Sequence, residues 1–102
     1  TVACLFPVFI SEDWDYVSFD YEFSGVADGA VLTFSIQAKD EIYPYFIASP
    51  TSLFSSGSSE LLPINSLRGQ EVYFIFELAS ESLGAQVDIA NLQLSQDARH
   101  TN

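Results

Sequence analysis

The clearest pattern in the chain is an alternation of apolar and polar residues between positions 15 and 38. Apolar side chains recur at every second position from Val17 to Phe23, and again from Ala30 to Ile36 after a loop that contains Gly and Asp over residues 25–29. Successive side chains of a strand point to opposite faces, so this period indicates half-buried strands. We expect the two strands to belong to one sheet and to form its central hairpin.

The flanking segments predict further strands, and two prolines indicate where they lie in a sheet. Residues 2–10 and 42–47 are apolar on both faces and contain Pro7 and Pro44, respectively. Proline has no N–H to donate to the ladder, which favours an edge strand or a bulge at both sites. The segment 71–79 is apolar at nearly every position, which is typical of a central strand.

The remaining pattern completes an all-β chain. Residues 61–64 predict a brief strand after a Ser-rich loop over 48–60, and 85–94 predict the last strand. Its period slips at Ala90-Asn91, as it does at a β-bulge. No segment has a sustained helical period. About seven short strands at this spacing predict an antiparallel β-sandwich of jelly-roll type.

Length and charge limit the partners. The 102 residues fit one domain spanning 1–102, and 14 acidic residues against 3 Lys and Arg give a net charge of −11. Such a surface repels phosphate backbones and anionic lipids, so we expect no nucleic acid partner. No stretch is long enough for a membrane span. The acidity, together with a first residue that is not Met, favours a fragment of a larger secreted protein at the cell surface or outside the cell.

Three segments also resemble a known group of domains. They are the aromatic-rich 17–23, then 32–36 after the Gly/Asp loop, and the closing segment 84–94. Together they resemble the jelly-roll accessory domains of secreted bacterial proteins, the galactose-binding-like and carbohydrate-binding-module group. The resemblance implies a non-catalytic module that binds carbohydrate. Ala90 stands where the closing motif of that group usually has an Asp, which in some members helps to hold a structural calcium ion.

Candidate catalytic residues are few, and we predict that the protein is not an enzyme. The single histidine, His100, lies in the polar tail, which leaves a Ser or Cys nucleophile without a base. Asp20 and Glu22 share one strand face with side chains about 7 Å apart, a spacing open to glycoside hydrolysis. The period of the strand gives the same spacing without any chemistry.

Calcium is the metal that the sequence favours, because oxygen ligands are plentiful. Glu12, Asp13 and Asp15 could converge with Asp28 or Asp88, and we take Asp13, Asp15 and Asp88 as the candidate ligands of a structural calcium ion. The alternative is an ordinary solvated acidic turn, since no twelve-residue calcium loop is present. Zinc and redox metals lack ligands, and no other cofactor is indicated.

Aromatic residues give the candidate ligand site. A sugar ring stacks its C–H face on Trp or Tyr while its hydroxyls bond to polar groups. Trp14 lies in an acidic loop, and Tyr43 and Tyr45 flank Pro44 on one predicted strand face, with Phe46 opposite. The alternative for Trp14 is a plug at the end of the sandwich.

Two functions follow from these observations. The first is a carbohydrate-binding or cell-surface attachment module with a polysaccharide or glycan partner. The second is a structural module that packs against another domain or subunit. An exposed apolar patch that includes Phe9, Tyr73 or Ile75 would favour the second, because a ligand module keeps such faces covered or polar.

Overall fold

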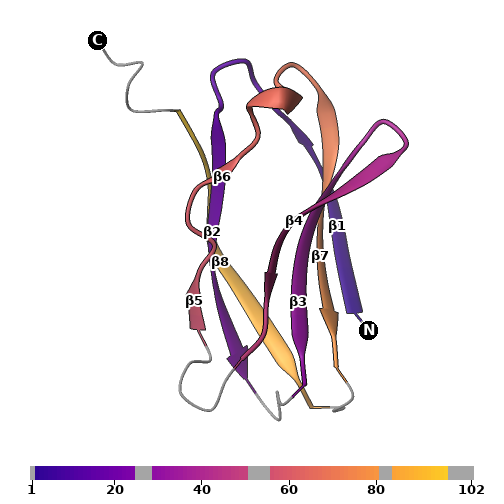
Figure 1. Ribbon diagram of the computed structural model, residues 1–102, viewed down its shortest axis with the longest axis vertical. Helices are drawn as coiled ribbons and strands as arrows, with labels where there is room; N and C mark the ends of the chain where they lie inside the picture. The colour runs from indigo at the N-terminus through magenta and orange to yellow at the C-terminus, as the bar shows by residue number, and fades with distance from the viewer. Residues whose placement is uncertain (1, 25–28, 51–55, 81–83, 97–102) are drawn as a thin grey trace.

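The protein is a sandwich of two antiparallel sheets (Figure 1). The computed structural model describes residues 2–24, 29–50, 56–80 and 84–96. The first sheet has the order β1-β7-β3-β4, and in the second sheet β2 pairs with β8, β5 and β6. The predicted all-β sandwich is therefore confirmed. The elements are β1 (Val2–Phe9), β2 (Tyr16–Ser24), β3 (Val31–Ala38), β4 (Glu41–Ala48), β5 (Ser56–Ser58), β6 (Leu62–Pro63), the 3-10 helix η1 (Asn65–Leu67), β7 (Glu71–Ala79) and β8 (Gln86–Ser95).

The order of the first sheet agrees with the positions of its prolines. β1 and β4, which contain Pro7 and Pro44, are the two edge strands, and β7 lies between β1 and β3 as a central strand. The register between β3 and β4 shifts beside Pro44, which leaves Tyr45 as an extra residue on β4. Edge strands are where a sheet accommodates proline, and all three sequence-based assignments are confirmed.

The predicted central hairpin over residues 15–38 is wrong. Its two strands, β2 and β3, lie in opposite sheets and pair with different partners. Both are strands with one buried face, as the alternation indicated. Their apolar side chains meet across the sandwich instead of within one sheet, because alternation specifies the buried face of a strand and not its neighbour.

Phenylalanine side chains fill the space between the sheets. The Phe19 ring, from β2, makes edge-to-face contacts with Phe34, Phe46 and Phe76, at centroid distances of 5.2, 5.5 and 5.0 Å. Phe34 also stacks on Phe76 at 4.7 Å. Such contacts contribute about 0.5–1.5 kcal/mol each beyond the burial of area. Rings from both sheets thus form one core.

The bulge predicted in the last strand is confirmed. The register of β2 with β8 shifts between Ser18 and Asp20, so that Asn91 and Leu92 lie opposite Phe19. Asn91 has a φ of 54°, and its Nδ2 donates a hydrogen bond to Asp20 Oδ2 at 2.7 Å. The predicted brief strand is β6, whereas the predicted Ser-rich loop contains the short strand β5.

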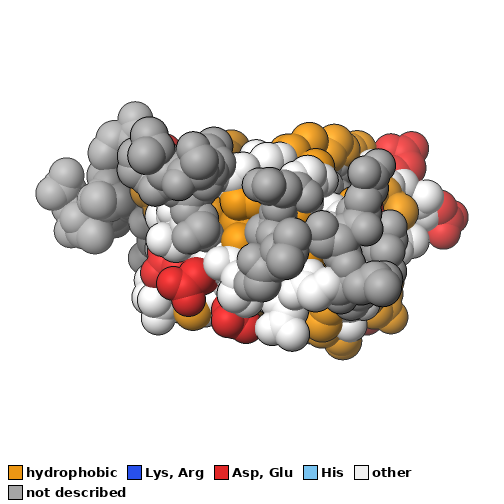
Figure 2. Space-filling model, turned by 90° about the horizontal axis from the view of Figure 1, so that it is seen from below, with side chains coloured by type: hydrophobic (Ala, Val, Ile, Leu, Met, Phe, Trp, Pro, Cys, Tyr) orange, Lys and Arg blue, Asp and Glu red, His pale blue; other side chains and the backbone are white. Residues whose placement is uncertain are grey.

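The two described basic residues lie toward one end of the sandwich. Lys39 is in the turn between β3 and β4, and Arg68 follows η1; this turn and η1 both lie toward the upper end in Figure 1. Figure 2 shows the opposite end, where acidic side chains are visible on both sides and no Lys or Arg is seen among the described residues. No helix in the described ranges is long and apolar enough to cross a membrane.

Candidate functional site

An ion pair fixes the connection between β1 and β2 at the upper end of the molecule. The Arg68 guanidinium pairs with the Asp15 carboxylate, which is buried. Arg68 Nε also donates to the Trp14 carbonyl oxygen at 3.3 Å, and the Ile64 N–H donates to the Asp15 carbonyl oxygen at 2.9 Å. These contacts join two segments that are distant in the sequence, residues 14–15 and 64–68, so the role that the structure gives Asp15 is to hold this end of the sandwich together.

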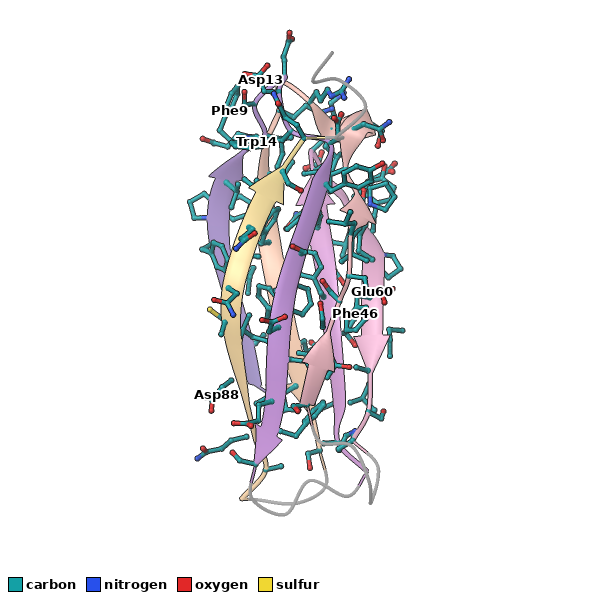
Figure 3. All side chains as sticks on the ribbon, turned by 90° about the vertical axis from the view of Figure 1, so that its left-hand side faces the viewer. Phe9, Asp13, Trp14, Phe46, Glu60 and Asp88 are labelled. Carbon is teal, nitrogen blue, oxygen red and sulfur yellow. The ribbon has the colours of Figure 1, made fainter. Side chains whose placement is uncertain are left out.

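Trp14 is half-buried and packs against the hydrophobic core. Figure 3 shows it at the same end as Phe9 and Asp13. A ring in this place shields the end of the core from water. The packing supports the alternative in which Trp14 closes the end of the sandwich.

Tyr43 and Tyr45 lie together, as the sequence predicted. They line a cavity of about 330 Å³, named here the tyrosine cavity. The Tyr43 hydroxyl donates to the Glu41 carboxylate, and this bond raises the pKa of Tyr43. Burial raises the pKa of Tyr45, an effect that its hydrogen bond with Ser66 partly opposes. The complete lining is Ala38, Lys39, Tyr43, Tyr45, Ser66, Leu67 and Gln70, without Trp14.

The alternation predicted that Phe46 lies on the face of β4 opposite to Tyr43 and Tyr45. This prediction is wrong. The Phe46 ring contacts Phe19 at 5.5 Å and Tyr21 at 5.6 Å, inside the core. Tyr45 also reaches the core, with its ring 6.4 Å from that of Phe34. The bulge at Tyr45 allows two successive residues to face inward, which a strict alternation cannot represent.

The structure does not bring together Asp13, Asp15 and Asp88. Asp13 lies at the upper end in Figure 3 and Asp88 on the lower half of β8, in a molecule 45 Å long. Asp15 pairs with Arg68 instead. Among the described residues, no three His, Cys, Asp or Glu side chains are arranged so that they could hold a metal ion. This corrects the expectation of a calcium site formed by these three residues; Asp28 lies outside the described ranges.

The outward faces of the two sheets differ sharply in chemistry. Large apolar side chains, between 46% and 64% exposed, occupy the outside of the first sheet. The outside of the second sheet is polar and acidic, with Asp20 and Glu22 on β2 and Asp88 directly opposite Glu22. The exposed apolar residues, here called the apolar face, are Leu5, Phe9, Ile42, Ile47 and Tyr73.

The sequence pattern indicates only part of the apolar face. Of the three residues that the pattern singles out, Phe9 and Tyr73 are exposed and Ile75 is half-buried. Leu5, Ile42 and Ile47 were missed. The available signal was that segments 2–10 and 42–47 are apolar at both parities although their prolines place them at sheet edges.

No protein-family model, curated protein or solved structure matches the chain. The resemblance to carbohydrate-binding accessory domains therefore stays a prediction from three sequence segments.

Proposed function

We propose that this protein is an interaction module whose apolar face packs against a neighbouring domain or subunit. The observation that carries the proposal is the set of five large apolar side chains exposed on one side of one sheet. Isolated exposed apolar residues are ordinary, but several on one face favour a protein contact site. Leu5, Phe9 and Tyr73 lie on the adjacent strands β1 and β7, and Ile42 and Ile47 lie on β4, across the strand β3. Burial of each half-exposed side chain would contribute on the order of 1 kcal/mol to docking.

Charge specifies the chemistry of the partner. Glu71 and Glu77 are exposed on β7 at the parity of Tyr73, and the whole chain has a net charge of −11. A second copy would bring the same charges and be repelled. The partner surface we propose is apolar and flanked by Lys or Arg. A cell-surface or extracellular setting stays a prediction from the acidic composition.

Site-specific photo-crosslinking of the protein in the cells that produce it tests this proposal. A benzophenone amino acid replaces Ile47 on the apolar face or, as a matched control, Ser18 on the outer face of the second sheet. We expect crosslinks from position 47 to converge on one apolar surface flanked by basic residues, and Ile47→Lys to abolish docking while changing unfolding free energy by less than about 0.5 kcal/mol. Scattered crosslinks, or equal yields from both positions, would contradict the proposal.

Glycan binding is a second candidate, favoured by the tyrosine cavity. Two aromatic rings beside the polar groups of Lys39, Ser66 and Gln70 form the combination that suits a sugar. In retention assays on immobilised polysaccharides, we expect Tyr43→Ala to weaken binding by about tenfold. Tyr73→Ala, which alters an exposed tyrosine of the apolar face, should bind as the unmodified protein does. Equal retention of the two variants would exclude the tyrosine cavity as the sugar site.

A further inference from the structure

The strand β8 forms an edge of the second sheet that no proline protects, unlike the two edges of the first sheet. Among the described strands β8 pairs only with β2, so one side of its backbone is unpaired. An edge of this kind can accept another strand, and prolines are a common protection against it. β1 and β4 contain Pro7 and Pro44, whereas β8 contains no proline. Its bulge begins at Asn91, which leaves Gln86–Ala90 as a regular stretch for pairing.

An apolar cavity of about 320 Å³ lies beside this stretch. Val87 and Ile89 of β8 line it together with Cys4 of the edge strand β1, and the core residues Phe76 and Leu78 form part of its wall. The cavity, named here the edge cavity, therefore lies between the edges of the two sheets. A strand added to β8 would extend the second sheet over it and direct every second side chain inward.

The charges around the edge cavity are negative. Glu77 and Asp88 belong to its lining, while the described basic residues Lys39 and Arg68 line cavities at the other end of the molecule. The end view in Figure 2 likewise shows acidic side chains without a described Lys or Arg. Electrostatic complementarity therefore favours a cationic partner and disfavours a second copy of this acidic chain.

We propose that the Gln86–Ala90 edge of β8 binds an extended segment of a partner protein in which apolar residues alternate with lysine or arginine. Main-chain hydrogen bonds to β8 would hold the segment, as in other cases of strand addition. Its apolar side chains enter the edge cavity beside Val87 and Ile89, and its cationic side chains lie on the outer face near Asp88, which Figure 3 places on this half of the strand. This surface is separate from the apolar face.

Titration with a short fluorescent peptide of alternating valine and lysine tests the proposal. A peptide of the same composition in two blocks is the control for alternation, and one with glutamate in place of lysine is the control for charge. We expect saturable binding of the alternating peptide alone, weakened by salt, with amide NMR shifts centred on Gln86–Ala90. Shifts confined to the apolar face, equal binding of the block peptide, or no binding would overturn the proposal.

Matched variants test where on the protein the peptide binds. Cys4→Trp places a large ring in the edge cavity, whereas Leu5→Trp, one residue along β1, places it on the apolar face. We expect the first to weaken binding by about tenfold and the second to leave it unchanged. Asp88→Lys tests the charge without altering the core, with Glu41→Lys at the other end as its control. Wild-type affinity in Asp88→Lys, or in a folded Cys4→Trp variant, would refute strand addition at this edge.

Discussion

A single contact between Tyr21 and Gly57 shows how closely individual residues determine the second sheet. The two residues face each other in the register of β2 and β5, and a Cβ atom at position 57 would lie 2.7 Å from Tyr21 Oη. The ring of Tyr21 also lies between Phe23, at 5.8 Å, and Phe46, at 5.6 Å. Glycine at position 57 therefore leaves room for a tyrosine that connects the short strand β5 to the core.

We expect Gly57→Ala to lower the free energy of unfolding by about 1 kcal/mol, because the new methyl group clashes with the tyrosine ring. In a Tyr21→Leu background the same change should be neutral or slightly stabilising, since it removes a flexible residue from the unfolded chain. Urea denaturation of the four proteins in this double-mutant cycle measures the difference. An equal cost in both backgrounds would mean that Tyr21 does not restrict position 57.

The bulge in β8 determines which side chains of that element reach the core. Val87 and Ile89 face inward opposite Phe23 and Tyr21, and a strict alternation would then turn Leu94 outward. The extra residue at the bulge reverses the parity, so that Leu94 packs on the core opposite Val17. Asn91 has the left-handed backbone conformation that this reversal needs, which is unfavourable for β-branched residues.

Substitutions at position 91 should follow that backbone requirement. We expect Asn91→Val to reduce unfolding free energy by about 1–2 kcal/mol, whereas Asn91→Gly loses only an exposed hydrogen bond to Asp20 and should cost less. Gln93→Val, at an exposed position of the same strand, is the control and should have little effect. Chemical denaturation measures all three. If Asn91→Val and Gln93→Val proved equally mild, the bulge would not depend on residue 91.

On the scale of the whole molecule, charge and apolar surface are unevenly distributed. Both described basic residues lie toward one end, one of them paired with a buried carboxylate, whereas exposed acidic side chains occur on both sheets, with Glu71 and Glu77 on the first and Glu22 and Asp88 on the second. A net charge of −11 on 102 residues opposes the compact state through self-repulsion. The apolar face is confined to the first sheet, so the sandwich has one side suited to protein contact and one suited to water.

Salt should therefore stabilise the isolated protein. Raising sodium chloride from low to high concentration screens the repulsion, and we expect the free energy of unfolding to increase by on the order of 1 kcal/mol. Glu60→Lys, which changes one exposed acidic residue, should show a smaller increase in the same denaturation experiment. A decrease with salt would show that attractive pairs such as that of Asp15 with Arg68 dominate the electrostatics.

The sequence by itself determined the local features of this protein. Its apolar–polar period located most of the strands, Pro7 and Pro44 identified two edges, and the slip at Ala90-Asn91 located the bulge. Each of these features depends on the residues of a single segment, so the sequence of that segment is enough to predict it. Tyr43 and Tyr45 could likewise be placed together, because they are neighbours on one strand.

Only the tertiary structure decided which strands and side chains are neighbours. The alternation in residues 15–38 gave each strand a buried face, yet β2 and β3 belong to opposite sheets. The same limit applies to Asp88, which is far from Asp13, and to the apolar face, which three strands form together. The side-chain pattern of a strand specifies which of its faces is buried. Its partners in the sheet, and the surfaces that it shares with other strands, depend on packing between segments that are distant in the chain.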